Sequence, residues 1–189
     1  MKNKLLQILN KINLENRLLL AVLLLVIITV IFPEAIASIK QWSDGVGILD
    51  TYLFYTPEEA YTNMTSYGVE GRDSYVFLLV TVDMFFPILY SLFLASLLFS
   101  LLKNFNFIYK KQIILLPFVV AIFDSLENAG LVFLLTRYPV EFPLFTRIVS
   151  LFTMLKWFLL GVVLVALIVR LIYSVLQFSH TIKIDKAKN

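Results

Sequence analysis

The stretch Ile113–Leu135, IILLPFVVAIFDSLENAGLVFLL, combines a long apolar run with two carboxylates near its middle, Asp124 and Glu127. About 20 consecutive apolar residues are enough for a helix to cross the hydrocarbon core of a bilayer, so this run predicts a membrane-spanning helix. An ionised side chain at the centre of a bilayer costs roughly 2.5–3.5 kcal/mol on insertion scales. The stretch therefore predicts a membrane protein and also indicates where a polar site lies.

The composition of the whole chain agrees with this class. Of its 189 residues, 60% are hydrophobic and 15% are charged, whereas soluble domains are about 45–50% apolar and 25% charged. The sequence contains no Cys, which excludes a disulfide framework and thiol chemistry. Basic residues cluster at the flanks of apolar segments, so nucleic acid is not an expected partner.

Three more apolar segments are long enough to cross a bilayer: Leu18–Ile39, Tyr75–Leu102 and Ile148–Val175. Backbone groups in lipid must be satisfied within the segment, which favours helices. We therefore predict an all-α integral membrane protein, a four-helix transmembrane bundle over residues 17–176. Membrane lipid is its expected partner, and the pattern leaves a homo-oligomer open.

Orientation follows from the distribution of Lys and Arg. The segments that are rich in these residues contain Lys2, Lys4, Lys11 and Arg17; Lys103, Lys110 and Lys111; and Arg170, Lys183, Lys186 and Lys188. The loop 40–74 is acidic. The positive-inside rule then predicts a multi-pass protein of the cytoplasmic membrane, with both termini and the basic tail 177–189 in the cytoplasm and loop 40–74 outside.

The N-terminal region has two interpretations. Residues 1–16 place apolar side chains on one helical face, which predicts an amphipathic helix on the cytoplasmic leaflet or a polar lead-in to the first span. The run Leu18–Phe32, followed by Ala35-Ile36-Ala37, also matches the layout of a secretory signal peptide. Cleavage after Ala37 would leave three spans.

Loop 40–74 contains a helix start signal. Thr56, Pro57 and Glu59 form a capping-box pattern, which predicts a short extracytoplasmic helix from Pro57 to about Tyr67 that Gly68 ends. Several Tyr and Trp residues in the loop favour the membrane interface. We expect the loop to lie over the outer mouth of the bundle, either as a lid or as a cover for helix ends.

The charged residues of three spans fall at similar depths. At about 1.5 Å per residue, Asp83 lies roughly 12 Å, Lys156 about 13 Å and Glu127 about 15 Å from the outer ends of their spans. Asp124 is deeper, at about 20 Å. This predicts that Asp83, Glu127 and Lys156 meet, closer to the outer leaflet than to the inner one.

The second span carries a polar stripe of its own. Asp83, Pro87 and Tyr90 share one helical face, with Arg72 three turns above. Because Pro87 has no N–H, the carbonyl oxygen of Asp83 loses its usual partner, which predicts a kink or a free carbonyl.

The other spans complete the candidate site. Asn128 lies on the same face as Asp124 and Glu127, and Trp157 lies beside Lys156. The predicted ligand-binding residues are Asp83, Lys156, Asn128, Arg72, Tyr90 and Trp157. Three acids and one Lys sum to −2 when ionised, so we expect at least one acid to keep its proton, and Asp124 and Glu127 form the candidate acid/base pair.

Several functions are compatible with this set. The first is binding of a small polar or lipidic ligand at a buried carboxylate/Lys site that opens to the outer side. The alternatives are a membrane-embedded acid/base enzyme that acts on a lipidic substrate, a proton- or ion-coupled transporter subunit, and a structural subunit in which the charges tie the spans together. The spans contain no His or Cys, so we expect no zinc site, and no cofactor is expected.

Overall fold

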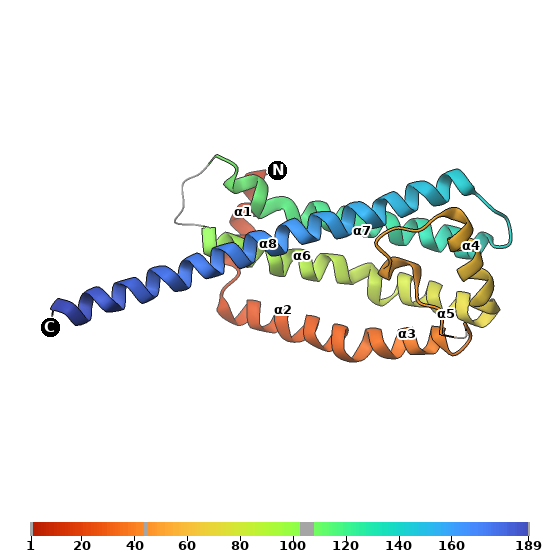
Figure 1. Cartoon of the computed structure of the whole chain (residues 1–189), viewed down its shortest axis with the longest axis horizontal. Coiled ribbons are helices and arrows are strands. Elements are labelled where there is room, and N and C mark those ends of the chain that lie inside the picture. Colours follow the sequence, from red (N-terminus) through yellow and green to blue (C-terminus); the bar gives the residue numbers. More distant parts are fainter. Residues whose placement is uncertain (1, 44, 103–107, 189) are drawn as a thin grey trace.

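The chain folds into an elongated bundle of helices (Figure 1). The computed structural model describes residues 2–43, 45–102 and 108–188; Lys103, which entered the orientation argument, lies outside them. The helices are α1 (Lys2–Lys11), α2 (Leu14–Val26), a π-helical turn (Ile27–Ile31), α3 (Phe32–Lys40), a 3-10 turn (Leu49–Thr51), α4 (Pro57–Ser66), α5 (Gly68–Val80), α6 (Val82–Leu102), α7 (Lys110–Arg137) and α8 (Pro143–Lys188). Across these described residues no strand is present, so the predicted all-α class is confirmed.

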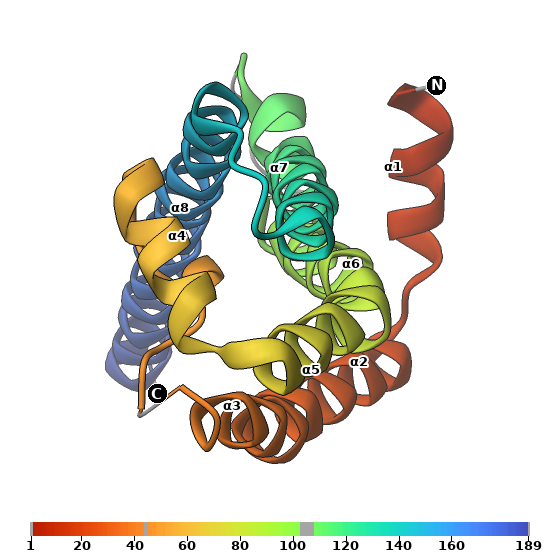
Figure 2. The same ribbon diagram turned by 90° about the vertical axis from the view of Figure 1, so that its right-hand side faces the viewer.

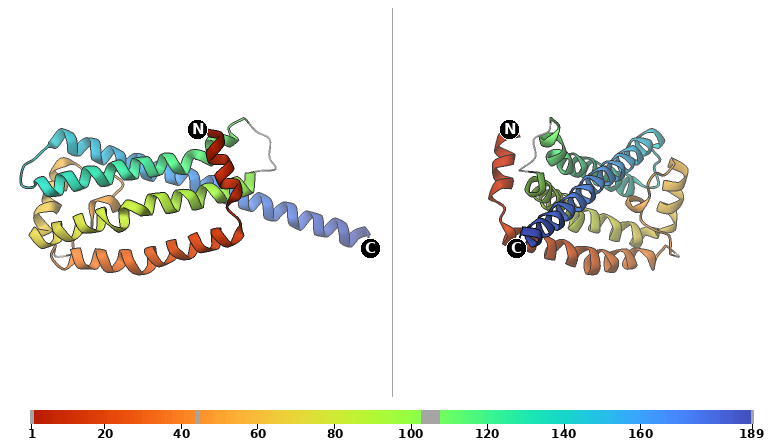
Figure 3. Two further views of the ribbon diagram at one scale, coloured as in Figure 1. Left: turned by 180° about the vertical axis from the view of Figure 1, so that it is seen from behind. Right: turned by 60° about the vertical axis from the view of Figure 1, so that its left-hand side comes forward.

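Among the described residues, four helical stretches are long and apolar enough to cross a membrane: Leu14–Lys40, Gly68–Leu102, Lys110–Arg137 and Pro143–Ser174. Each overlaps one of the predicted spans. The second begins at Gly68 instead of Tyr75, so helix replaces the last part of the predicted loop 40–74. The fourth is the first part of α8, which continues without a break to Lys188. The remainder of α8 extends out of the bundle as a single helix (Figures 1 and 3).

The second stretch is two helices joined at Thr81. Thr81 has φ −105° and ψ −87°, outside the helical region, and its hydroxyl donates to the Phe77 carbonyl oxygen at 2.6 Å. A non-helical residue interrupts the helical periodicity between α5 and α6. The single helical face on which the sequence placed both Arg72 and Asp83 therefore does not continue across it.

The predicted capping box begins α4. The Thr56 side chain accepts from the Glu59 N–H at 3.2 Å, and the Glu59 carboxylate accepts from the Thr56 N–H at 2.8 Å. Pro57 occupies the first turn, where a missing N–H costs nothing. Gly68 has φ +64°, a value that glycine adopts readily, and it lies at the turn between α4 and α5. The predicted helix and its end are both confirmed.

The first stretch lies along one side of the bundle and α1 lies across its end (Figures 2 and 3). Asn13 caps α2 by accepting from the Asn16 N–H at 2.9 Å. Of the apolar residues of α2, only Leu24 is buried, and the outward face carries exposed Leu and Val side chains. In α1, Leu9 is fully buried, and this helix packs on α6.

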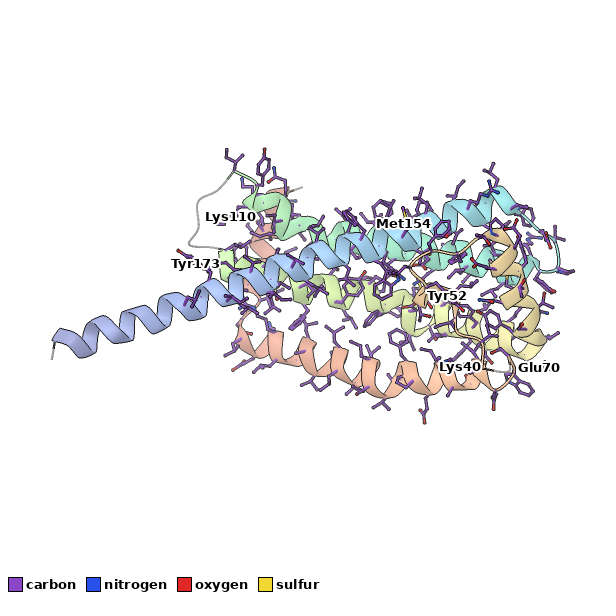
Figure 4. The ribbon with its side chains drawn as sticks, in the orientation of Figure 1. Lys40, Tyr52, Glu70, Lys110, Met154 and Tyr173 are labelled. Atoms are coloured by element: carbon purple, nitrogen blue, oxygen red, sulfur yellow. The ribbon has the colours of Figure 1, made fainter. Side chains whose placement is uncertain are left out.

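Two apolar cores divide the bundle along its length. One lies at the end where α4 is found, called here the α4 end, and includes Tyr75 and Leu131. The other lies towards α1, at the α1 end, and includes Leu98 and Val163. Figure 4 shows Lys40 and Glu70 at the α4 end, and Lys110 and Tyr173 at the α1 end. The buried charged residues of α6, α7 and α8 lie between the two cores. They form what is called here the polar layer: Asp83, Asp124, Glu127 and Lys156.

Helices α7 and α8 lie in close contact at Gly130. A Cβ atom at this position would run into the side chain of Val149 on α8. The glycine lets the two antiparallel backbones approach, as small residues do in packed membrane helices. One turn before Gly130 on α7 and one turn after Val149 on α8, Glu127 lies opposite Thr153.

Candidate functional site

Lys156 on α8 lies at the centre of the polar layer. Its ammonium lies 2.5 Å from Glu127 Oε2 and 3.3 Å from Asp124 Oδ1, both on α7. The lysine is 7% exposed and Glu127 is fully buried. Because Asp124 and Glu127 are one helical turn apart on one face, a single ammonium bridges both carboxylates. The positive charge of Lys156 is therefore already engaged.

Thr153 fixes the second oxygen of Glu127. Its hydroxyl lies 2.7 Å from Glu127 Oε1 and donates to it, and it lies one turn before Lys156 on the same face of α8. Thr153 is fully buried. The sequence placed it on the stripe of Lys156 but did not include it in the site. Threonine in a membrane helix commonly bonds to its own backbone, so residue type alone gave little signal.

Asp83 is held through its backbone. The Asn128 side-chain N–H donates to the Asp83 carbonyl oxygen at 3.0 Å, at the position that Pro87 leaves without an N–H partner. The predicted free carbonyl is thus confirmed, and Asn128 is its partner. In the part of the chain that the structure describes, no hydrogen bond or ion pair engages the Asp83 carboxylate, although the residue is only 5% exposed.

Tyr90 closes the polar layer towards the α1 end. Its hydroxyl donates to Asp124 Oδ2 at 2.9 Å. The Tyr90 ring lies edge-on to Phe86 with centroids 5.3 Å apart, and Phe86 meets Phe32 of α3 at 4.9 Å. Beyond Tyr90 the bundle interior is the apolar core that contains Leu98. The buried charged residues therefore lie on the α4 side of Tyr90.

Asp50 is a further acid of the layer, and the sequence did not predict it. It belongs to the loop between α3 and α4, which enters the bundle and is held by its own backbone. The Asp50 N–H donates to the Tyr75 hydroxyl at 3.2 Å. The Asp50 carbonyl oxygen accepts from Trp157 Nε1 at 3.2 Å and from Lys156 Nζ at 3.5 Å.

A sequence signal for this loop existed. Ile48 and Leu49 form an apolar pair directly before Asp50, and both are buried. Tyr55 anchors the other end of the loop, because its N–H donates to the Ser150 hydroxyl at 3.0 Å. Such a pattern is typical of a loop that packs inward instead of lying on a surface.

Burial of Asp50 has an electrostatic consequence. Desolvation raises the pKa of its carboxyl above the ordinary 3.8, and the nearby Asp124 charge adds to this rise. Lys156 and the Tyr75 hydroxyl oppose it. The carboxyl of Asp50 therefore holds its proton to higher pH than an exposed aspartate does.

The structure brings together seven of the eight predicted site residues: Asp83, Tyr90, Asp124, Glu127, Asn128, Lys156 and Trp157. Arg72 is the exception. Its guanidinium donates to the Met64 carbonyl oxygen at 2.8 Å and stacks 4.2 Å from the centroid of the Tyr138 ring. It therefore ties α5 to α4 and to the residue that follows α7, and the non-helical backbone at Thr81 separates its helix from that of Asp83.

The polar layer contains more acceptors than donors. Four carboxylates, Asp50, Asp83, Asp124 and Glu127, surround one ammonium, a formal sum of −3 if all are ionised. Asp50 Oδ1 and Asn128 Oδ1 are buried and have no hydrogen-bond partner. Among the described residues, no three His, Cys, Asp or Glu side chains are arranged to hold a metal ion. The arrangement therefore suits a donor of hydrogen bonds that carries positive charge.

A separate pocket of about 400 Å³ lies at the α4 end. Tyr61 and Thr65 of α4 line it, together with Tyr138 and Glu141 near the turn between α7 and α8. None of the predicted site residues lines this pocket. It belongs to the surface where α4 docks on the start of α8, since the Tyr61 hydroxyl accepts from the Thr146 hydroxyl of α8 at 3.3 Å and from the Phe142 N–H just before α8 at 2.6 Å.

In comparisons with known proteins, no family model, curated protein or solved structure matches the chain.

Proposed function

We propose that the chain is a multi-pass protein of the cytoplasmic membrane, with both termini in the cytoplasm and the α4 end outside. The four long apolar helices and their exposed Leu, Ile and Phe side chains support insertion into lipid. The distribution of Lys and Arg supports the orientation. Because the sequence has no Cys, single cysteines at Lys40 and at Lys110 can be labelled with an impermeant thiol reagent in intact cells. Labelling at Lys40 but not at Lys110 is expected, and the reverse pattern would contradict the orientation.

We propose that the protein binds a small or lipidic ligand at the polar layer, reached from the α4 end. The observation that carries this proposal is the excess of buried acceptors: four carboxylates against one ammonium, with Asn128 Oδ1 and Asp50 Oδ1 unfilled. Buried acceptors without a partner cost about 1–3 kcal/mol each. A ligand that supplies donors removes this cost.

A purely structural role accounts for part of the layer only. The contacts of Lys156 with Asp124 and Glu127 join α7 to α8, as a structural ion pair would. Among the described residues, no hydrogen bond or ion pair engages the Asp83 carboxylate, so it does not serve as an interhelical tie. Interhelical polar contacts in membranes average about 0.6 kcal/mol, so they are weak reasons to bury extra acids.

The apolar core at the α1 end favours binding over transport. Leu98, Val120 and Val163 are fully buried on three different helices between the polar layer and that end. A transporter needs access from both sides of the membrane. An enzyme that uses Asp124 and Glu127 would need to free them from Lys156, whereas a binding site can use this ion pair as it stands.

The test is native mass spectrometry of the protein extracted from its own membrane. The wild type is expected to carry an adduct of defined mass that Asp83→Asn loses. Asp73→Asn, a matched change at an exposed acid of α5, is expected to keep it. A wild-type protein without any adduct, whose unfolding temperature no lipid class or small polar compound raises, would overturn the proposed function.

A further inference from the structure

The charge and hydrogen-bond balance of the polar layer also indicates the chemical class of the ligand. We infer that the site binds a primary ammonium group, carried by a lipid headgroup or by a free small amine. This inference rests on the proposed function, because it names the ligand class of the same site.

The first argument is charge. Lys156 is bridged by Asp124 and Glu127, so it has no unused charge with which to attract an anion. Arg72 is engaged with the Met64 carbonyl and the Tyr138 ring. Four buried carboxyl groups face one ammonium, and a bound cation would stabilise the ionised form of a carboxyl that otherwise keeps its proton, which favours a cation over an anion.

The second argument is the orientation of Asn128. Its side-chain N–H is fixed by the Asp83 carbonyl oxygen at 3.0 Å, which leaves its buried Oδ1 as the group that still needs a donor. The same contact sets Asn128 beside Asp83, a residue that is only 5% exposed. Among the described residues, the Asp83 carboxylate has no hydrogen bond or ion pair. An ammonium group offers three N–H donors, enough for Asn128 Oδ1 and Asp83 together.

The third argument separates a primary ammonium from other cations. A quaternary ammonium carries the charge but no N–H, so it would leave Asn128 Oδ1 unfilled. A divalent metal needs several ligands arranged around it, and among the described residues no three His, Cys, Asp or Glu side chains form such a group. Aromatic rings suit an organic cation: Trp157 already lies 5.3 Å from the Lys156 ammonium, and Tyr90 borders the layer.

The experiment measures retention of lipids by the full-length protein in native mass spectrometry. Delipidated protein in detergent is mixed with equal amounts of phosphatidylethanolamine, phosphatidylcholine and phosphatidylglycerol of the same acyl chains. Retention of phosphatidylethanolamine at least about tenfold above phosphatidylcholine is expected, because both headgroups are zwitterionic and differ in their N–H donors. Added ethanolamine distinguishes the sources: stabilisation by ethanolamine without preferential lipid retention indicates a free amine.

Variants locate the site. Asp83→Asn keeps the shape of the side chain and is expected to weaken phosphatidylethanolamine or ethanolamine binding about tenfold to a hundredfold. Asp73→Asn is the control and is expected to leave it unchanged. The comparison of lipids on the wild type needs no variant, so it remains decisive if Asp83→Asn does not fold.

The outcomes separate the two proposals. The ammonium inference would be overturned if ethanolamine does not stabilise the protein and the lipids show either preferential retention of phosphatidylglycerol or equal retention of phosphatidylcholine and phosphatidylethanolamine. Loss of that lipid binding in Asp83→Asn would leave the proposed function standing. If neither the three lipids nor ethanolamine bind, this inference is overturned. The proposed function is overturned as well only if the protein from its native membrane carries no adduct and no other compound stabilises it.

Discussion

Replacement of Lys156 by Met tests whether one ammonium holds the polar layer together. Met keeps the length of the side chain and removes the charge, which leaves Asp124 and Glu127 buried beside each other. At 3.3 Å and an effective dielectric constant of about 20, the contact with Asp124 contributes about 5 kcal/mol of gross Coulomb energy, and the shorter contact with Glu127 contributes more. Desolvation offsets most of this, and removal of one partner from a buried pair costs about 3–5 kcal/mol net. For a chain of this size, that corresponds to a loss of roughly 6–20 °C in unfolding temperature.

The assay is thermal unfolding in detergent, followed by tryptophan fluorescence. Lys40→Met, at an exposed lysine at the end of α3, is the matched control and is expected to behave as the wild type. Combination of Lys156→Met with Asp124→Asn and Glu127→Gln removes the unpaired charges and is expected to recover at least half of the loss. Lys156→Met that unfolds within about 2 °C of the wild type would refute the reasoning, since it would limit the net cost to about 1 kcal/mol.

Three further predictions concern packing, backbone and pH. Gly130→Ala places a methyl group against α8 and is expected to cost about 1–3 kcal/mol in a denaturation series, whereas an unchanged midpoint would contradict the close approach. Asn128→Leu leaves the carbonyl beside Pro87 without a donor and should cost about 1–3 kcal/mol; adding Pro87→Ala, which restores an N–H, should return part of it. Burial raises the pKa of the Asp50 carboxyl, so the folded state holds this proton more tightly than the unfolded chain and the contribution of Asp50 to stability falls as pH rises above 3.8. Asp50→Asn should therefore gain on the wild type in unfolding temperature as the pH rises from about 4, and a difference that stays constant from there to about pH 8 would contradict the shift.

The elements that follow from local chemistry could be predicted from the sequence. Apolar runs of sufficient length predicted the four long helices, and the pattern of Thr56, Pro57 and Glu59 predicted α4, because both signals depend on neighbouring residues only. The unmatched carbonyl beside Pro87 also followed from local geometry, and its partner Asn128 lay among the predicted site residues.

The misplaced and missing residues depend on contacts that local patterns do not encode. Arg72 was assigned to the face of Asp83 on the assumption of one continuous helix, and the non-helical backbone at Thr81 ends that helix. Asp50 enters the layer because a loop packs between α5 and α8, through contacts with Tyr75 and Trp157 that are 25 and 107 residues away. From sequence alone, an acidic loop outside the predicted spans is expected to be exposed to water.

Density in the polar layer of the protein purified from its native membrane tests the central claim most directly. The account predicts non-protein density within hydrogen-bond distance of the Asp83 carboxylate and Asn128 Oδ1, with Lys156 still between Asp124 and Glu127. It would be contradicted by a layer in which Asp83 turns to pair with Lys156 and the neighbouring side chains close around it, with no density besides the chain itself.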